Sequence, residues 1–203
     1  MLRCTEPVTI YRGAVKDFRI GHWFALKVKP RHEKTVATSL DAKGYKQLVP
    51  LYRCARRWSD RIKVLELPLF PGYAFCRFEF ADRLKVLQTP GVLGIVTIGK
   101  APAPVRDDEI QAIATIVSSQ VPAEPAVFLR TGQSVFVIKG PLAGVRGFLQ
   151  EIKNKRSLVV SVTLLQRSVA VELNTDSVVA VGSNRTAPEM VRDSEDSKAG
   201  MLD

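Results

Sequence analysis

The sequence is poor in the residues and motifs from which catalytic sites are usually built. Its 203 residues include only two histidines, and neither has a cysteine, a second histidine or an acid at the spacing of a metal-ligand set. The phosphate-binding pattern GxxxxGK followed by serine or threonine, the dinucleotide pattern GxGxxG and the nucleophile pattern GxSxG are all absent. The chain is therefore not expected to be an enzyme, and we expect neither a metal nor a cofactor.

Long hydrophobic runs and paired cysteines are also missing. No run of about 18 apolar residues occurs, so a membrane-spanning helix is not expected. The first twenty residues lack the unbroken apolar core of a signal peptide. The three cysteines (Cys4, Cys54 and Cys76) form no CxxC pair and leave one thiol over, which favours a reducing compartment. We expect a cytoplasmic protein that does not bind a membrane.

Positive charge is what the sequence has in excess. The formal net charge is +10, and residues 184–203 contribute −2, so the rest of the chain carries +12. A body this basic suits a polyanionic partner, because neutralising phosphates releases counterions and supplies affinity independent of sequence. The alternative is a basic surface without a special partner.

The hydrophobic pattern of residues 21–117 predicts a domain of strands and helices. Apolar residues alternate in the predicted strands and recur every three or four positions in the predicted helices. This order predicts an α+β fold, with an antiparallel sheet flanked by helices. Strands are expected over 23–30, 45–54, 61–70, 72–80 and 92–99, and helices after Pro30, after Asp82 and over 106–117.

The other segments differ in composition. Residues 1–20 show no clear period and are expected to form a loose N-terminal extension. Residues 118–126 are small, polar and twice interrupted by proline, which is typical of a linker. Residues 127–182 contain five short β-branched runs separated by turn residues, which predicts a small closed barrel. Residues 183–203 are rich in polar and charged residues, and we expect disorder there.

An aromatic-rich stretch, LELPLFPGYAFCRFEF at residues 65–80, carries more rings than one face of a sheet needs. In a strand, the even-numbered residues from Ala74 to Phe80 share an apolar face, and Tyr73 and Phe75 lie on the other face. Rings on the second face are either open to a partner protein or covered by another layer of the same chain. Three short helices can hardly cover both faces, which favours a partner.

Two basic runs occur in the same region, RCARRWSDRIK at 53–63 and KVKPRHEK at 27–34. Guanidinium groups beside an aromatic ring can pair with phosphates and stack on bases. Either run alone is also compatible with a solvated loop, but two of them in one small domain predict a nucleic-acid surface. The candidate residues are Lys29, Arg31, His32, Arg56, Arg57, Trp58 and Arg61.

Several segments together resemble the NusG family of transcription elongation factors. They are WFALKVKPRHEK, PLFPGYAF, TPGVLGIV and the turn IKGPLAGVRGFLQEI with the later VSVTLLQRSVAVEL, within residues 22–182. The resemblance implies a polymerase-binding domain at 21–117 and a KOW domain, a small SH3-like barrel, at 127–182. It also implies a monomeric elongation and antitermination factor that suppresses pausing and termination and recruits a partner through its KOW barrel.

The resemblance assigns roles to single positions. An apolar cavity around the PLFPGY turn would receive the clamp helices of the largest RNA polymerase subunit, and the matching residues are Trp23, Phe70, Pro71, Gly72, Tyr73, Phe75 and Val92. The basic loop would reach nucleic acid in the elongation complex, such as non-template DNA. In the KOW domain, the residues matching a contact to a ribosomal protein or Rho are Leu142, Leu165, Gln166 and Arg167.

Two departures bear on the type of factor. Leu165-Gln166-Arg167 stands where general family members have a Phe-Gly-Arg turn, which weakens the case for Rho and the ribosome. The pattern RRWSDRIKVLELPLFPGYAF resembles specialised paralogues of the RfaH and UpxY type. A helical, fold-switching barrel is not expected, because 127–182 is rich in β-branched residues. The alternatives are a housekeeping factor that couples polymerase to Rho or the ribosome, and a ribosome-associated KOW protein that binds RNA.

Overall fold

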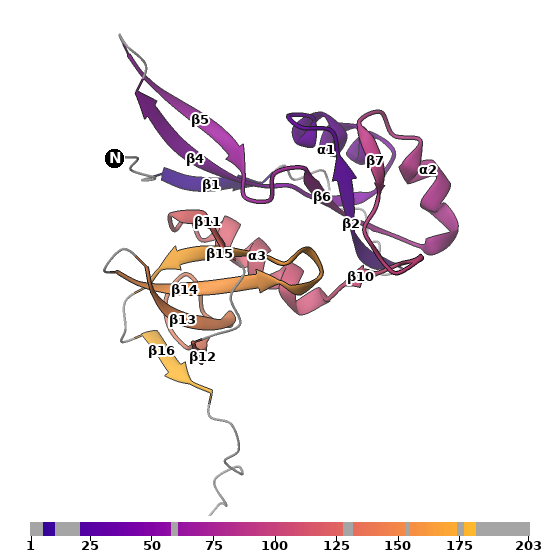
Figure 1. The fold of residues 1–203 in the computed structure, drawn as a ribbon. Helices are drawn as coiled ribbons and strands as arrows, with labels where there is room; N and C mark the ends of the chain where they lie inside the picture. The colour runs from indigo at the N-terminus through magenta and orange to yellow at the C-terminus, as the bar shows by residue number, and fades with distance from the viewer. Residues whose placement is uncertain are drawn as a thin grey trace, which may run out of the picture.

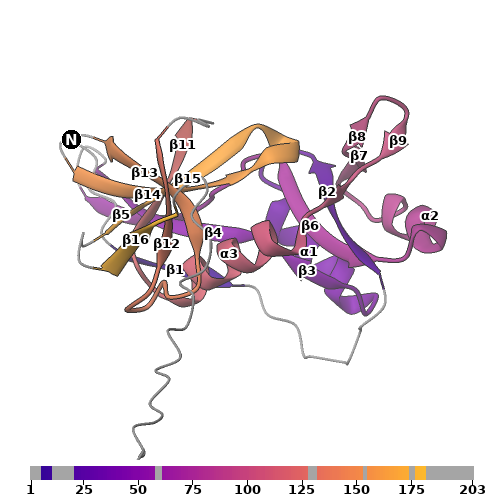
Figure 2. The same ribbon diagram turned by 90° about the horizontal axis from the view of Figure 1, so that it is seen from below.

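The computed structural model describes residues 6–10, 21–57, 61–127, 132–152, 155–173 and 177–181. An α+β N-terminal part is followed by a β-rich C-terminal part, as Figures 1 and 2 show. This confirms the predicted sheet-and-helix region and the predicted β-rich character of the C-terminal part. The helices in the described part of the chain are too short or too polar to span a membrane. The predicted disordered tail lies outside the described residues.

An antiparallel sheet of five strands forms the centre of the N-terminal part. β2 pairs with β6 along one edge and with β7 and β10 along the other, and β3 extends the sheet beyond β6. Ala25 lies opposite Phe75, and Leu26 lies opposite Ala74. Neighbouring residues of each strand therefore point to opposite faces. The strands are β2 (His22–Val28), β3 (Lys46–Leu48), β6 (Tyr73–Phe78), β7 (Val92–Ile95) and β10 (Pro104–Val105).

Both faces of this sheet are covered by helices. α1 (Glu33–Ala42) and α2 (Arg83–Leu87) pack on the face that carries Leu26. α3 (Asp107–Ser118) packs on the opposite face, which carries Phe75. The first turn of α3 contains three acidic residues, where the helix dipole favours negative charge. The second face is thus not left open by the helices, contrary to what their short lengths suggested.

A second, three-stranded sheet has the order β1-β4-β5. β4 (Pro50–Arg57) and β5 (Ile62–Pro68) form a long antiparallel hairpin that extends from the body of the molecule (Figure 1). β1 (Glu6–Ile10) pairs with the other edge of β4, so the expectation of a loose extension over residues 1–20 is wrong for these five residues. An unpaired strand edge leaves backbone donors and acceptors free, and β1 satisfies those of β4.

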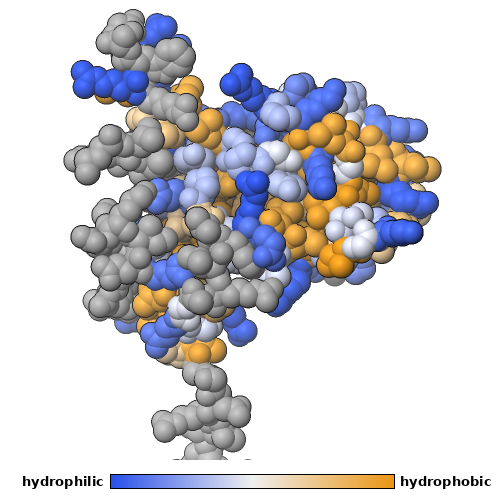
Figure 3. Space-filling model, in the orientation of Figure 1, coloured by the Kyte–Doolittle hydropathy of each residue, from blue (hydrophilic) through white to orange (hydrophobic). Residues whose placement is uncertain are grey.

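The strand predicted over 92–99 is divided into two shorter strands in the structure. β7 ends at Ile95, and β8 (Thr97–Ile98) turns away to pair with β9 (Ala101–Pro102). Leu93 is 61% exposed because β7 lies at the edge of the sheet. Figure 3 shows hydrophobic residues gathering on the surface at this end of the molecule, where Figure 1 draws α2 and β7. The short 3-10 helix η1 (Phe80–Asp82) leads into α2.

The C-terminal part is a sheet of six antiparallel strands in the order β11-β15-β14-β13-β12-β16. A 3-10 helix, η2 (Thr163–Leu165), connects β14 with β15. We call this part the C-terminal sheet. Its strands are β11 (Ala123–Val127), β12 (Gln133–Val137), β13 (Arg146–Ile152), β14 (Lys155–Val162), β15 (Arg167–Glu172) and β16 (Val178–Ala180).

The connection between the two parts is shorter than the linker predicted over 118–126. α3 includes Ser118, and β11 begins at Ala123 and pairs with β15 along five residues. Pro125 lies inside β11, which is compatible with pairing because β11 is at one end of the strand order and proline lacks only the backbone donor. Residues 119–122 join the last helix to the C-terminal sheet.

Candidate functional site

The turn between β5 and β6 has a defined backbone geometry. The backbone N–H of Tyr73 donates to the carbonyl of Phe70 at 3.0 Å, and Gly72 has a φ of +80°. Proline at the second position and a left-handed glycine at the third are the residues that a type II turn requires. The PLFPGY sequence therefore folds as the composition of its turn predicts. We call residues 70–73 the PG turn.

The aromatic residues around the PG turn are brought together, but they do not line an open cavity. Trp23, Phe70 and Phe75 are 6%, 1% and 0% exposed, and they share one buried cluster with Ile113 of α3. The rings of Phe70 and Phe75 meet edge to face, with centroids 5.5 Å apart. Another layer of the same chain covers these rings, the alternative that the sequence had left open. We call the three buried rings of Trp23, Phe70 and Phe75 the aromatic floor.

The other residues assigned to polymerase binding lie at different exposures. Pro71 is exposed, whereas Gly72 and Tyr73 are half-buried. Tyr73 packs against the same cluster as Phe75. Val92 is half-buried against the other hydrophobic cluster, on the α1 side of the sheet. Pro71, Gly72 and Tyr73 are thus the members of the predicted set that reach the surface beside the buried rings.

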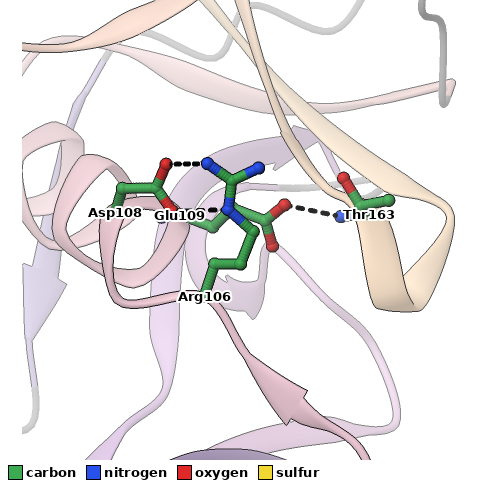
Figure 4. A network of polar contacts seen from close by, with 4 residues as sticks. All are labelled: Arg106, Asp108, Glu109 and Thr163. Carbon is green, nitrogen blue, oxygen red and sulfur yellow. Dashed lines mark hydrogen bonds and ion pairs between the residues drawn. The ribbon is translucent and has the colours of Figure 1, made fainter.

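The residues that connect β14 to β15, together with the first residue of β15, contact this region directly. The guanidinium carbon of Arg167 lies 5.4 Å from the centroid of the Tyr73 ring, within the range of a cation–π contact. The backbone N–H of Thr163 donates to the carboxylate of Glu109 on α3 at 3.3 Å (Figure 4). Buried residues of the C-terminal sheet, including Leu165 at 8% exposure, belong to the same hydrophobic cluster as the aromatic floor. The C-terminal sheet is therefore docked on the α3 side of the N-terminal part.

Two predicted surfaces meet at this contact. Leu165, Gln166 and Arg167 are residues that the family resemblance assigned to a partner of the C-terminal part, and Arg167 covers Tyr73. Gln166 is exposed and has a φ of +50° at the end of η2. Leu142 lies elsewhere: it is 2% exposed and lines a cavity of about 360 Å³ with Val121 and Pro122. The four residues do not form one exposed patch.

The first basic run forms the junction between β2 and α1. Lys29, Arg31 and His32 are exposed there. The junction is held by its backbone, since Lys29 N–H donates to the Gly91 carbonyl at 2.9 Å. Arg31 has a φ of +65°, a left-handed conformation that costs a residue with a side chain more than glycine. A cationic side chain is thus projected from a position where glycine would fit more easily.

The described residues of the second basic run, 53–57 and 61–63, lie on β4 and at or just before the start of β5. Arg57 and Arg61 are exposed, whereas Trp58 and the side chain of Arg56 lie outside the part of the chain that the structure describes. An ion-pair cluster links this hairpin to α1. Lys34 donates to the carboxylate of Glu66 on β5 at 2.6 Å, and the Nε atom of Arg53 lies 3.6 Å from the same carboxylate.

The ion-pair cluster changes the titration of its acid. The hydrogen bond from Lys34 lowers the pKa of Glu66 below its ordinary value; partial burial opposes this shift, and the charges of Lys34 and Arg53 add to it. No role was predicted from the sequence for Glu33 or Glu66, and Lys34 was assigned only as part of the basic run at 27–34. A signal was present in the basic run, where an acid and a base occupy the first helical turn, but their partners lie more than thirty residues away.

The chain is similar to several known proteins. The family model described as Transcription termination factor nusG matches residues 21–114. Transcription termination/antitermination protein NusG of Thermus thermophilus is 31% identical over 166 residues, which cover 75% of this chain and 90% of the relative. The protein of the same name from Pseudomonas aeruginosa is 29% identical over 174 residues, 78% of this chain and 98% of the relative. A solved structure, Domain interaction in Thermotoga maritima NusG, has 21% identity and a TM-score of 0.49, over 80% of this chain and 98% of that one.

Replacing the acid of the ion-pair cluster should give a pH-dependent loss of stability. Because the folded-state pKa of Glu66 is lowered, its contribution is complete above the ordinary glutamate pKa and disappears as the pH falls through the lowered value. Glu66→Gln should reduce the free energy of unfolding at pH 7 by up to about 1 kcal/mol, as for a partly exposed ion pair. Urea denaturation at pH 7 and at pH 3 measures this, with the exposed Glu79→Gln as the matched control. A loss that is equally large at both pH values would contradict the prediction.

Removing two polar contacts between the parts, that of Arg167 with Tyr73 and that of Thr163 with Glu109, should loosen their docking. A cation–π contact and a hydrogen bond of this kind together contribute about 1–2 kcal/mol, so Glu109→Ala/Arg167→Ala should raise the undocked population roughly 5- to 30-fold. NMR rotational correlation times of the two parts and small-angle X-ray scattering detect this change.

Arg106→Ala is the matched control for the docking variant. Arg106 pairs with Asp108 at the same end of α3, as Figure 4 shows. This substitution removes a polar contact of comparable kind without touching Thr163 or Tyr73. Wild-type tumbling and scattering in the double variant would show that these contacts do not hold the parts together.

Proposed function

This chain belongs to the NusG family, and we propose that it is a non-enzymatic transcription elongation and antitermination factor. Its N-terminal part binds RNA polymerase and suppresses pausing and termination, and its C-terminal part, a KOW domain with an SH3-like barrel, recruits a second partner. The observation that carries this proposal is the PG turn, which presents Pro71 and Tyr73 beside a buried aromatic floor. An apolar surface rimmed by basic residues is typical of a protein interface.

The polymerase surface consists of a rim and a floor. Pro71, Gly72 and Tyr73 contact the clamp helices of the largest subunit, and Trp23, Phe70 and Phe75 fix the position of that rim from beneath. Val92 contributes from the opposite side of the sheet, next to the β2–α1 junction. Polymerase binding requires the C-terminal sheet to move off Tyr73. The contacts of Arg167 and Glu109 are of a strength that a protein interface can replace.

The two basic surfaces contact the nucleic acid of the elongation complex. The β4–β5 hairpin extends away from the PG turn, so docking that turn on the clamp carries Arg56, Arg57, Trp58 and Arg61 toward the exposed non-template DNA strand. Lys29, Arg31 and His32 supply a second set of cations at the β2–α1 junction. Exposed arginines with a neighbouring aromatic residue suit phosphates and an unstacked base.

The C-terminal part recruits its partner through a segment that faces the N-terminal part in the docked arrangement. Leu165 is buried there and Arg167 lies over Tyr73, so both become available once the C-terminal sheet has left Tyr73, whereas Gln166 is already exposed. Because this loop lacks the Phe-Gly-Arg turn of general family members, we propose a specialised paralogue of the RfaH and UpxY type rather than a housekeeping factor. Binding assays of this chain with isolated Rho and with the isolated small-subunit ribosomal protein distinguish the two types of factor, since a housekeeping factor binds one or the other.

Truncation of the rim tyrosine should weaken polymerase binding. Tyr73→Ala removes a half-buried aromatic anchor, which should cost tenfold or more in affinity, on the order of 2 kcal/mol. Phe80→Ala is the matched control, because Phe80 is 50% exposed and lies near α2. Fluorescence anisotropy with purified polymerase measures both variants, and circular dichroism verifies their folding. Unchanged affinity of a folded Tyr73→Ala variant would refute the polymerase-docking role.

Substitution of the hairpin arginines should affect nucleic-acid binding alone. Arg57→Ala/Arg61→Ala should leave affinity for core polymerase near wild type. Its binding to elongation complexes with an open bubble should lose roughly one unit of log–log salt slope per phosphate contact removed. Lys100→Ala/Lys139→Ala removes two exposed charges outside the hairpin and serves as the control. If the salt dependence of the hairpin variant equals that of wild type, the hairpin has no nucleic-acid role.

A further inference from the structure

Two consecutive residues at the start of α1 reach toward the surfaces that the proposed function uses. Glu33 is 5% exposed, and its Oε1 atom accepts a hydrogen bond from the backbone N–H of Gly72 at 2.9 Å. Lys34, the next residue, donates to Glu66 on β5 at 2.6 Å. Glu33 thus contacts the PG turn, and Lys34 contacts the base of the hairpin strand that leads into it. We call these two residues the Glu33–Lys34 pair.

The hydrogen bonds of Gly72 determine where the PG turn lies. Its N–H is held by Glu33, and its carbonyl accepts from the backbone N–H of Val28 at 2.9 Å. Leaving out its chain neighbours, no atom lies within 4 Å of the position that a Cβ on Gly72 would occupy, so that side of the turn faces open space. Glycine also reaches more backbone conformations than other residues do. Besides the hydrogen bond from Tyr73 to Phe70 within the turn, these two hydrogen bonds tie the turn to α1 and β2.

The use of a buried carboxylate as the hydrogen-bond acceptor for the Gly72 N–H has a free-energy cost. Burying an ionised acid costs free energy unless it is hydrogen-bonded or paired. The hydrogen bond from Gly72 and the position of Glu33 in the first turn of α1 both offset this cost. A charged acceptor also makes a stronger hydrogen bond to a backbone N–H than a neutral one does. The turn next to Tyr73 is thus held by the strongest kind of acceptor that the chain offers there.

The Glu33–Lys34 pair holds both ends of one short segment. Glu66 and Gly72 are the ends of this segment, which contains the last residues of β5 and the first residues of the PG turn. Glu66 also lies near Arg53 on β4, so the pairing extends to the second strand of the hairpin. Leu69, in the middle of the segment, is tied to Pro50 through a backbone hydrogen bond of 2.9 Å. A rigid helix end therefore holds the segment that connects the hairpin to Tyr73.

We propose that the Glu33–Lys34 pair positions the PG turn and the β4–β5 hairpin relative to each other. Glu33 is the positioning residue for the turn that presents Tyr73, and Lys34 is the positioning residue for the hairpin that carries Arg57 and Arg61. This inference rests on the proposed function, because the proposed function gives the PG turn and the β4–β5 hairpin their binding roles. Its physical content is that binding surfaces need supporting contacts to hold their geometry.

The test uses the full chain and a readout that does not involve polymerase. The ¹H–¹⁵N signal and hydrogen-exchange rate of the Gly72 amide report directly on the hydrogen bond to residue 33. Glu33→Ala should raise the exchange rate of this amide about tenfold or more, as expected for loss of one charge-assisted hydrogen bond. The amide of Phe75 in the sheet core should not change. Glu33→Gln keeps an oxygen acceptor at the same reach and should restore most of the protection.

Affinity measurements then connect the geometry to binding. Glu33→Ala should weaken polymerase binding about fivefold or more, and Glu33→Gln should recover it. Lys34→Met should leave the Gly72 amide and polymerase affinity unchanged, and should weaken binding to elongation complexes with an open bubble. Glu33→Asp keeps the charge but has a shorter reach, so it gives an intermediate loss of protection even if Glu33→Ala does not fold.

Different failures have different meanings. A Gly72 amide that exchanges at the wild-type rate in both Glu33→Ala and Glu33→Asp overturns the inference without reference to polymerase. Normal polymerase affinity of Glu33→Ala, together with weakened affinity of Tyr73→Ala, overturns the positioning role alone. Normal affinity of Tyr73→Ala overturns the proposed function itself, and the positioning role with it.

Discussion

The antiparallel pairing of β2 with β6 is the constraint on which the rest of the N-terminal part depends. With Ala25 opposite Phe75, one set of side chains faces α1 and α2, and the other set faces α3. A register slip of one residue would exchange the two sets and turn the charged side chain of Lys27 toward the apolar core under α1. The PG turn is the entry to β6, so this register also decides where Tyr73 lies.

In the docked arrangement, two weak polar contacts and a shared hydrophobic cluster join the C-terminal sheet to the N-terminal part. Residues 119–122 are all that separates α3 from β11, and so short a connection keeps the C-terminal sheet at a high effective concentration near the N-terminal part. The two polar contacts contribute about 1–2 kcal/mol, and the buried apolar residues that the two parts share add to them. A partner that binds one of the two surfaces more strongly shifts the equilibrium toward the separated arrangement. Under the proposed function, docking and partner binding compete for Tyr73 and Arg167.

The start of α1 combines this geometry with charge. Its exposed cations lie in the same short segment as Glu33, which fixes the PG turn, and Lys34, which pairs with the hairpin. Under the proposed function, this part of the chain contacts protein and nucleic acid together, and misplacement of either surface weakens binding at both. The start of α1, a helix that packs into the hydrophobic core through Val36 and Leu40, makes hydrogen bonds to both surfaces.

Features that depend on local patterns could be predicted from the sequence, whereas the cover of each surface could not. Period-two alternation separated Tyr73 and Phe75 from the Ala74 face, and proline followed by glycine predicted the turn before them. The order of strands and helices and the change to β-branched runs after residue 126 came from the same kind of pattern, and the structure agrees with the resulting α+β and β-rich parts.

The contacts that could not be predicted join residues that are far apart in the sequence. They are the pairing of β1 with β4, the cover of α3 over Phe75, the contact of Arg167 with Tyr73 and the hydrogen bond of Glu33 to Gly72. Periodicity predicts that a face is apolar, but it does not predict which part of the chain buries that face. The cover depends on the path of the whole chain and on the free energy of competing contacts, and neither quantity is encoded in any single segment.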